Sequence, residues 1–462
     1  MDHSSKKPPY SLSEAISDSL VSFLPSSLTC LVEYSMSILN LAFVGMLGDV
    51  LLLSGLGLGS VTVNICIFSI DFCGGLDTLV SQAFGRRNYT LCSVYYRTSM
   101  IVAIIFFIPQ MLICINYKAI FQILGQPEES AEIAGIYIIY ILPGCLVFKL
   151  FDCTRRHLSA CGVYSPSLFI TIITMVIHLV NLYLFVYLLG YRMKAVAIIT
   201  DITFLLNFVL LSANTSRARI QWISCFDLAP FKKIYEYLYY GIPSCFMLLI
   251  EWWVYEMLII FSGWLGVAEL ATSIVVLNLY NTIYSFSLGL QYAAICLIGN
   301  SIGEGDLLKA QTSILALFIC SFMTIVMIVA TCMIFKENII LLFTDDQRIV
   351  ENFCKVFTMF LICSGIQMVQ GTSIGIIKAA GYQIKATLVN LFILWGIKIP
   401  LVYYFTFVQS KSYFGIWEGT ALGNIILMGC YFMLILGVPW RELIEANYLQ
   451  LNRRLELSEN LL

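Results

Sequence analysis

Charge is what this chain lacks most. Only 12% of its 462 residues are Asp, Glu, Lys or Arg, and it has just three histidines. A soluble domain carries about 25% charged residues, whereas here 60% of the residues are hydrophobic and the mean hydropathy is +0.88. This composition excludes a soluble globular protein and indicates an integral membrane protein. The net charge of −2 gives no sign of a nucleic-acid partner, and we expect none.

Signals of enzymatic chemistry are missing as well. The sequence has no nucleotide-binding loop, no metal-ligand spacing and no nucleophile elbow, so we expect neither an enzyme nor a metal or organic cofactor. Its sixteen cysteines are scattered through apolar runs, which is typical of small hydrophobic residues packed in helices. The first 15 residues are polar and contain no small-residue cleavage site, so we expect the first apolar run to stay in the mature chain.

What the chain does contain is long apolar runs. A helix needs about 20 predominantly apolar residues to cross a bilayer. Twelve runs are long enough, and several are long enough to tilt or bend. They cover residues 18–46, 51–83, 93–117, 132–153, 163–189, 195–212, 237–262, 270–299, 311–335, 352–377, 386–408 and 415–438. We therefore predict twelve transmembrane helices.

The positive residues predict the orientation of these helices. If the N-terminus is cytoplasmic, the inner loops hold twelve Lys and Arg residues, among them Arg155, Arg156 and Lys378, and the outer loops hold seven. Positive residues concentrate on the cytoplasmic side of membrane proteins, and those of both tails agree with this assignment. We expect both termini in the cytoplasm. No targeting motif separates the plasma membrane from a vacuolar or vesicular membrane.

An internal repeat divides the chain into two halves. Residues 25–48 and 243–266 match at several positions, with Pro25 against Pro243 and Glu33 against Glu251. The same offset relates Ser81-Gln82-Ala83-Phe84-Gly85 to Gly299-Asn300-Ser301-Ile302-Gly303, and Ala160-Cys161-Gly162 to Ala379-Ala380-Gly381. Each half holds six spans, an even number, so both have the same orientation and an axis along the membrane normal relates them.

The repeat predicts the fold and its domains. We expect an all-α integral membrane protein whose twelve helices form two pseudo-two-fold-related six-helix bundles around a central cavity. An N-terminal tail (1–17) precedes the N-lobe (18–213), and a cytoplasmic linker (214–233) connects it to the C-lobe (234–438). The C-terminal tail (439–462) reads either as an amphipathic helix on the inner surface or as a frayed end.

Several motifs resemble one transporter family. The stretch Pro243-Ser244 continuing to Leu249-Ile250-Glu251-Trp252-Trp253-Val254-Tyr255-Glu256 is similar to the seventh-segment motif of the eukaryotic branch of the multidrug and toxic compound extrusion (MATE) family. Residues 76–85 (LDTLVSQAFG), residues 299–306 (GNSIGEGD) and Gln370-Gly371 with Gly381-Tyr382-Gln383 resemble three further motifs of that branch. The resemblance covers residues 18–438. It implies a secondary antiporter, usually monomeric, that exports organic cations or amphiphilic compounds.

Two positions depart from the family pattern. The family usually has an acid three residues before the Gln-Gly of segment 10, where this chain has Gln367. Plant-type members have a Gln eight residues after the proline of segment 1, where this chain has Glu33. One carboxylate has in effect moved from the C-lobe to the N-lobe. The departure leaves a cation-coordinating role at Gln367 unsupported and makes Glu33 a candidate that the family pattern would not nominate.

The C-lobe supplies the main candidate binding residues. A carboxylate in an apolar segment is costly, which makes Glu251 a candidate for binding both substrate and proton. Loss of hydration favours the protonated form, so such a group can hold a cation when charged and release it when protonated. Glu256 lies about 140° around the helix from Glu251, so we expect it to face a neighbouring helix inside the C-lobe as an internal proton site or a strut. Tyr280 and Tyr284 are candidates for cation–π contact with a flat organic cation.

The N-lobe adds polar groups at depth. Besides Glu33, these are Asn40, Asp71 and Asp201. Gly289 falls opposite Asp71 in the repeat, so Asp71 is either a second proton site or the partner of a cation such as Lys149. Asp77 is expected to contact Arg86 or Arg87, and His178 to be a hydrogen-bonded core residue rather than a proton relay.

The two matched prolines are the remaining candidates. Pro25 and Pro243 are either hinges for bending segments 1 and 7 or simple kinks.

The sequence thus favours a proton-driven exporter of organic cations, with Na⁺ as the alternative coupling ion. A lipid-linked substrate flippase would need a cavity lined with Arg and Lys, and the spans offer mainly Lys149 and Lys398, with acids more numerous. A receptor or channel would not need the repeat, and no filter motif is present. We expect a small organic molecule and the lipid bilayer as the partners of a monomeric protein.

Overall fold

A computed structural model describes residues 10–123, 127–215, 228–341, 346–409 and 412–459, and these residues form helices without a strand. The N-lobe comprises α1 (Leu12–Gly45), α2 (Val50–Val63), η1 (Asn64–Phe68), α3 (Gly74–Gly85), α4 (Tyr89–Ile115), α5 (Tyr117–Ile123), α6 (Glu128–Ala160), α7 (Ser165–Asn181), η2 (Leu182–Leu188) and α8 (Arg192–Ser212). Most of the predicted linker, 216–227, and the start of the N-terminal tail, 1–9, lie outside the described residues.

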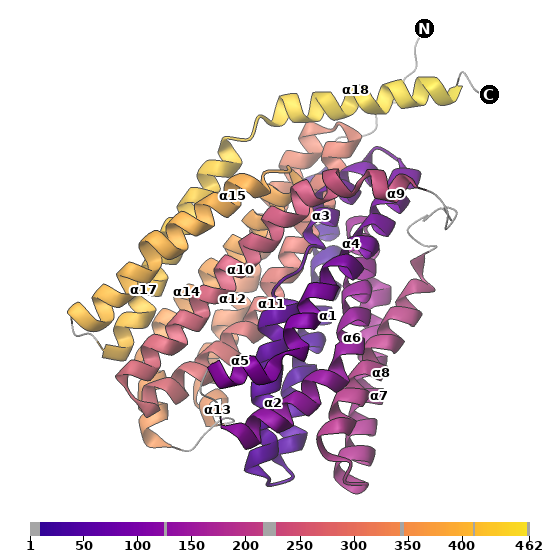
Figure 1. Ribbon diagram of the computed structural model, residues 1–462. Coiled ribbons are helices and arrows are strands. Elements are labelled where there is room, and N and C mark those ends of the chain that lie inside the picture. Colours follow the sequence, from indigo (N-terminus) through magenta and orange to yellow (C-terminus); the bar gives the residue numbers. More distant parts are fainter. Residues whose placement is uncertain (1–9, 124–126, 216–227, 342–345, 410–411, 460–462) are drawn as a thin grey trace.

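The C-lobe has the same plan. After the short α9 (Ala229–Lys232), it comprises α10 (Ile234–Leu265), α11 (Val267–Glu304), α12 (Leu307–Ile334), α13 (Lys336–Leu341), α14 (Gln347–Ala379), α15 (Gln383–Asn390), η4 (Leu391–Lys398), α16 (Ile399–Tyr403), η5 (Tyr404–Val408) and α17 (Ser412–Leu436). A final helix, α18 (Trp440–Glu459), packs on α11 and α12 at the end of the molecule where both termini lie (Figure 1).

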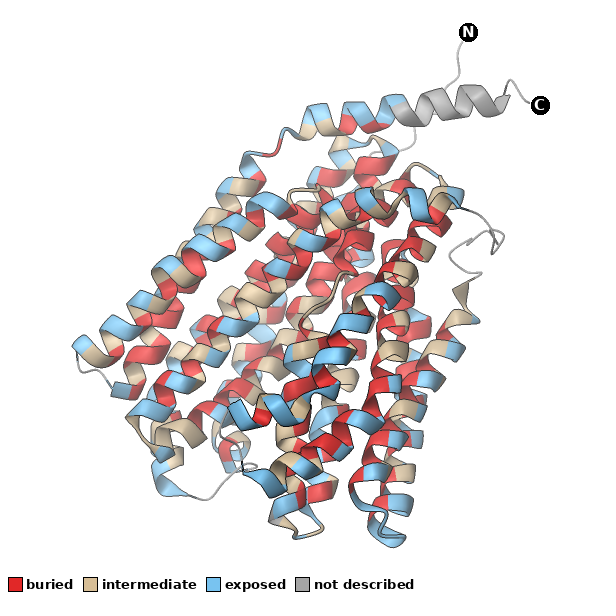
Figure 2. Ribbon diagram, viewed as in Figure 1, coloured by how far each residue is buried: buried red, intermediate tan, exposed pale blue. Residues whose placement is uncertain are grey.

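Twelve of these helical segments are long and apolar enough to cross a membrane, which confirms the predicted number. Their outward surfaces carry exposed apolar side chains such as Ile108, Phe322 and Val326, while the buried residues gather inside each lobe (Figure 2). One hydrophobic cluster fills the C-lobe and two fill the N-lobe. An apolar outer surface around a packed interior is what a bilayer-embedded bundle requires. The chain is therefore a multi-pass integral membrane protein.

The second predicted span was wrong in one respect. Residues 51–83 do not form one helix, because the helical chain stops after Phe68 and resumes as α3 at Gly74. The Asp71 carboxylate accepts a hydrogen bond from the Cys73 backbone N–H at 3.0 Å, a local bond that competes with helix formation. Asp71 therefore lies in a break between two helices and not within a continuous span.

The two repeated glycine motifs pack against each other. A Cβ atom placed on Gly85 of α3 would lie 2.2 Å from the Asn300 carbonyl oxygen of α11. A Cβ on Gly303 would lie 2.2 Å from the Gln82 carbonyl oxygen. Gln82 and Asn300 occupy matching positions of the repeat, so the two contacts are related by the pseudo-two-fold axis. Glycine at these positions lets the two lobes touch through their backbones.

Helix α1 connects the lobes as well. Its first half packs on α11 and α12, where Phe23 joins the C-lobe core, and it also packs on α2 and α7 of the N-lobe. The helix continues through Pro25, as α10 continues through Pro243, so neither proline ends its helix. The contacts of α1 and α3 with the C-lobe show that the two lobes meet near the end of the molecule that holds α3, α18 and the termini (Figure 1).

Candidate functional site

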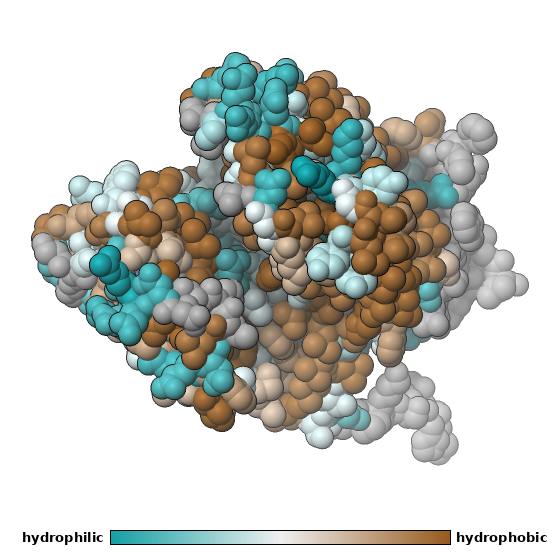
Figure 3. All heavy atoms as spheres, turned by 90° about the horizontal axis from the view of Figure 1, so that it is seen from below, coloured by the Kyte–Doolittle hydropathy of each residue, from teal (hydrophilic) through white to brown (hydrophobic). Residues whose placement is uncertain are grey.

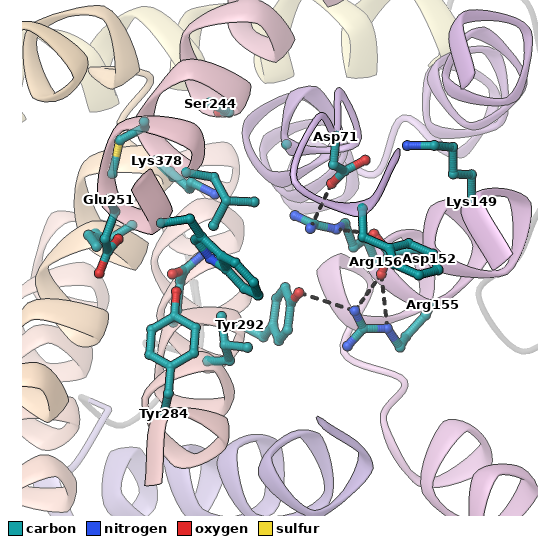
Figure 4. Close-up of a pocket in the computed structure, with 18 of the residues that line it drawn as sticks. Asp71, Lys149, Asp152, Arg155, Arg156, Ser244, Glu251, Tyr284, Tyr292 and Lys378 are labelled. Atoms are coloured by element: carbon teal, nitrogen blue, oxygen red, sulfur yellow. Dashed lines mark hydrogen bonds and ion pairs between the residues drawn. The ribbon is translucent and has the colours of Figure 1, made fainter. Parts of the chain in front are cut away.

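A cavity of about 180 Å³ lies between the lobes. Figure 4 shows Glu251 and Tyr284 of the C-lobe on one side, Asp71, Arg155 and Arg156 of the N-lobe on the other, and Tyr292 between them. Seen from the end opposite the termini, the molecular surface is hollowed between its two halves (Figure 3). The site thus uses one wall from each half of the repeat.

A chain of hydrogen bonds leads to Glu251 on the C-lobe wall. The Gln367 side-chain N–H donates to Glu251 Oε1 at 3.2 Å, and the Tyr280 hydroxyl donates to Gln367 Oε1 at 2.6 Å. The Tyr255 hydroxyl lies 2.7 Å from that of Tyr280. Because a phenol has one proton and Tyr280 donates it to Gln367, Tyr255 donates to Tyr280. All three donors therefore point along the chain toward the carboxylate.

A buried cation lies beside this chain. The Lys398 ammonium group donates to Asn424 Oδ1 at 3.0 Å and lies 4.7 Å from the centre of the Tyr255 ring. Lys398 is 1% exposed, and no carboxylate is within ion-pair distance of it in the part of the chain that the structure describes. Its charge is held by an amide oxygen and an aromatic face, and it contributes a positive field behind Glu251.

A smaller pocket of about 80 Å³ adjoins Glu251 between α10 and α11. Glu256, Tyr280 and Tyr284 line it together with Glu251. Glu256 faces α11 across this pocket but is exposed, whereas we had expected an internal position within the C-lobe. Glu251 and Glu256 lie on different sides of α10, as the helical geometry predicted, but both carboxylates line this pocket.

The N-lobe wall is an ion-pair cluster. Arg155 pairs with Asp152 and lies 3.8 Å from Glu33 Oε1, and Arg156 pairs with Asp152 at 2.7 Å and with Asp71 at 2.9 Å. Buried charges of this kind are tolerated only when they are paired. The partner of Asp71 is thus Arg156. Asp71 therefore has a cationic partner, the second of the two alternatives, but Lys149, named there as an example, instead donates to the backbone carbonyls of Ile67 and Ile70.

Several contacts of this cluster cross to the C-lobe. The Arg155 guanidinium donates to the Tyr292 hydroxyl at 3.2 Å and lies 5.0 Å from the centre of that ring. Asp77 pairs with Lys378 of the C-lobe at 3.1 Å, and Arg156 lies 3.4 Å from the same oxygen of Asp77. The ion pairs of Asp77 are therefore with Lys378 and Arg156, whereas we had expected a contact with Arg86 or Arg87.

Other predicted residues lie away from the cavity. Asn40 Oδ1 accepts a hydrogen bond from His178 Nε2 at 3.0 Å, and the Asn40 amide N–H donates to Thr200 at 3.1 Å. His178 is fully buried and also contacts Thr203 at 2.9 Å, the hydrogen-bonded core position that we predicted for it. Asn40 thus belongs to a polar cluster inside the N-lobe, apart from Glu251, Gln367, Tyr280 and Tyr284.

Sequence reasoning missed the residues that form most of the N-lobe wall. We had placed Arg155, Arg156 and Lys378 in inner loops, but all three lie in helices and face the lobe junction. Removing them from the loops weakens the charge bias that predicted the orientation. A signal was present: no glycine or proline interrupts residues 152–160, and Asp152 stands three and four residues before the two arginines, where an ion pair on one helix face is expected.

A metal ion does not suit the same cluster. Asp71, Cys73 and Asp152 offer ligand atoms within 4.8 Å of one another. Arg156, however, pairs with both carboxylates, so a positive charge already occupies the place of a cation. Within the described residues, the two carboxylates pair with the arginine, and Cys73 Sγ lies 3.2 Å from Cys153 Sγ.

Comparison with known proteins decides the family. The model of the family described as MatE matches residues 25–184 and again residues 243–404, beginning at the two repeated prolines. The chain belongs to the MatE family. It is 27% identical over 414 residues to Protein DETOXIFICATION 12 of Arabidopsis thaliana, covering 87% of this chain and 85% of that protein. It is 25% identical over 425 residues to Multidrug and toxin extrusion protein 2 of Mus musculus, covering 91% and 74%.

Solved structures share the fold. The eukaryotic MATE transporter AtDTX14 superposes with a TM-score of 0.88 at 20% identity, covering 95% of this chain and 99% of that one. The Vibrio cholerae MATE transporter VcmN in its bent form gives 0.81 at 15% identity, covering 95% and 99%. Members of the MatE family are transporters, so this chain is a membrane transporter and not an enzyme, as predicted.

Proposed function

We propose that this MatE-family protein exports organic cations or amphiphilic compounds in exchange for protons, with Glu251 as the carboxylate that binds both. The names of its relatives, which refer to detoxification and to multidrug and toxin extrusion, support the export of foreign or toxic organic molecules. The cavity between the lobes is the binding site in this proposal.

One observation carries the assignment of Glu251. Of the three carboxylates that line the cavity, Asp71 and Asp152 are ion-paired with arginines, whereas Glu251 is held by the amide of Gln367 and has no ion pair within the described chain. A carboxylate without a cationic partner retains a charge to offer a substrate. Tyr284 and Trp252 line the same cavity and supply aromatic faces for a cationic ring.

The coupling follows from competition for one carboxylate. Ionised Glu251 attracts an organic cation, and a proton arriving from the opposite side neutralises it and releases that cation. Alternating access then requires that the two lobes rock about the cavity, so that Glu251 faces one side of the membrane at a time. Glu33 is a second proton site in this proposal. Its Oε1 is buried without a hydrogen-bond partner, 3.8 Å from Arg155.

Transport measurements test the proposal. Purified protein in liposomes is given a fluorescent organic cation and an imposed pH gradient, acid on the trans side. We expect accumulation that collapses with the gradient, falls to background in Glu251→Gln and is reduced in Glu33→Gln. Glu304→Gln, an exposed glutamate paired with Lys309, is the matched control and transports normally. Full transport by Glu251→Gln, or transport driven by a sodium gradient alone, contradicts the proposal.

One observation favours a second candidate, a flippase for a lipid-linked anionic substrate. The cavity is lined by four cations, Lys149, Arg155, Arg156 and Lys378, against three carboxylates, so the predicted excess of acids does not hold at this site. Ion pairs leave Arg155, Arg156 and Lys378 little free charge, and Lys149 is held by two backbone carbonyls, which is why we rank this candidate second. Competition separates the two, because a flippase is inhibited by anionic amphiphiles and not by organic cations.

A further inference from the structure

A second and larger cavity lies on the outer face of the N-lobe. This groove has a volume of about 740 Å³ and runs between α2, α6 and the junction of η2 with α8. Its lining residues are Leu52, Ile133, Ile136, Tyr140, Phe185, Gly190, Tyr191, Arg192, Met193, Lys194, Ala195, Ile198, Ile199 and Ile202. It shares no lining residue with the cavity between the lobes, so it is a separate site.

The groove is open toward the bilayer. Its floor is made of buried side chains such as Leu52 and Ile199, whereas Ile136, Ile198 and Ile202 along its edges are between 36% and 44% exposed. These edge residues belong to spans that cross the membrane, so the open side faces hydrocarbon. A concave apolar surface of this kind fits an acyl chain.

Charge is confined to one part of the groove. Arg192 and Lys194 are the two charged lining residues, and no carboxylate lines it. The Lys194 ammonium group lies 5.3 Å from the centre of the Tyr140 ring. Arg192 is 3.8 Å from Asp49, but that pair is exposed, with 70% of the arginine side chain accessible, and so it is weak. Both cations can therefore reach an anionic group above the apolar part.

We propose that this groove binds an anionic phospholipid, with an acyl chain along the isoleucines and the phosphate at Arg192 and Lys194. The combination selects the ligand. An apolar chain without a headgroup would leave both cations unpaired, a free phosphate would not cover the apolar floor, and an organic cation would be repelled. Basic pockets between membrane-spanning helices bind anionic headgroups for the same reason.

Native mass spectrometry of the full-length protein tests the site. The protein is purified in detergent, stripped of lipid and titrated separately with phosphatidylglycerol, phosphatidylcholine, diacylglycerol and inorganic phosphate. We expect one phosphatidylglycerol to bind more tightly than the rest. Arg192→Ala with Lys194→Ala should lower its affinity by roughly 10- to 30-fold, because each cation contributes a factor of roughly three to five.

Two further variants make the result decisive. Ile198→Trp fills the groove and leaves both cations in place, so it should weaken phosphatidylglycerol and diacylglycerol alike. Lys118→Ala removes an exposed lysine of α5 outside the groove and should change nothing. Equal binding of phosphatidylglycerol and diacylglycerol to the wild type, or an unchanged affinity in the double alanine variant that elutes as a folded protein, would overturn the proposal.

Discussion

At the scale of single residues, this protein holds polar groups in a membrane by giving each a specific partner. A chain of hydrogen bonds that begins at Tyr255 and runs through Gln367 ends on Glu251. The acids of the N-lobe wall form ion pairs with two arginines. The family's acid in segment 10 is replaced by Gln367, which nevertheless lies beside Glu251. The Gln367 amide therefore donates a hydrogen bond to Glu251, which an ionised carboxylate at this position could not do.

The hydrogen-bond chain predicts the effect of removing its middle hydroxyl. Tyr280→Phe leaves Gln367 Oε1 without the donor at 2.6 Å and removes the acceptor of Tyr255. An unsatisfied buried polar group costs about 1–3 kcal/mol, so we expect a lower thermal unfolding midpoint in detergent. Tyr183→Phe is the control, since Tyr183 is an exposed residue stacked on Tyr187, and its midpoint should stay at the wild-type value. Equal midpoints for the two variants would contradict the assignment.

The ion pair between the lobes makes a stronger prediction. Asp77 is the one carboxylate within ion-pair distance of Lys378 in the described chain, and both side chains are buried. Asp77→Asn leaves the ammonium group without a counter-charge, which costs about 3–5 kcal/mol in buried pairs. Asp49→Asn removes the exposed partner of Arg192, where the expected loss is below about 1 kcal/mol. Thermal unfolding compares the two, and a smaller loss for Asp77→Asn would show that the pair is dispensable.

At the scale of helices, α3 and α11 cross with their backbones in close contact at the junction of the lobes. Thr78 donates to the Lys378 carbonyl at 2.6 Å, and the Gln82 amide donates to the Ala379 carbonyl at 2.8 Å, so α14 joins the same junction. The repeated glycine motifs of α3 and α11 thus form a contact between the two lobes. It seals the end of the cavity that lies nearer the termini.

Glycine at this crossing can be tested by adding one methyl group. In Gly303→Ala the new Cβ meets the Gln82 carbonyl oxygen at 2.2 Å, so α3 and α11 must separate. Overpacking of this kind costs about 1–3 kcal/mol, and we expect a lower unfolding midpoint. Gly57→Ala is the control, because no atom lies within 4 Å of its Cβ, and alanine in a helix interior should stabilise by about 0.5–1 kcal/mol. The prediction fails if Gly303→Ala is as stable as Gly57→Ala.

At the scale of the whole molecule, the cavity is closed toward the end that bears α18 and the termini. Arg86 of the N-lobe donates to Asn447 of α18 at 3.1 Å, and Tyr448 packs against Gly305 at the end of α11. The pocket beside Glu251 and Glu256 is on the other side of this seal. A molecule with this shape should admit water-soluble molecules from one face only.

Thiol labelling tests this asymmetry. In a background with the exposed Cys354 changed to Ser, Asn281→Cys lines the pocket near Glu251, and Thr78→Cys lies in the sealed junction, where Thr78 is 2% exposed. We expect a membrane-impermeant maleimide added outside intact cells to label the first at least tenfold faster than the second. Labelling of Thr78→Cys as fast as that of Asn281→Cys would contradict a closed end. Labelling of Asn281→Cys only in inverted membranes would contradict the expected cytoplasmic termini.

The class of the molecule follows from its amino-acid sequence alone. Low charge and twelve apolar runs dictate membrane-spanning helices, because a bilayer leaves the backbone no other partner, and the offset between Glu33 and Glu251 reveals two related halves. These features depend on composition and order along the chain. They can therefore be predicted without knowing which side chains contact one another.

The positions of the buried charges, in contrast, depend on how the helices pack. Hydropathy counts every charged residue as unfavourable inside a span. It therefore placed Arg155, Arg156 and Lys378 in loops. In the folded chain Asp152 pairs with Arg155 and Arg156 on one helix, and Asp71 and Asp77 meet Arg156 and Lys378 across helices, which offsets that cost. Partners distant in the sequence are set by packing, and the pairing of Asp77 with Lys378 spans 301 positions. The location of ion pairs, and with it the one cavity carboxylate left without a pair, is a property of the fold.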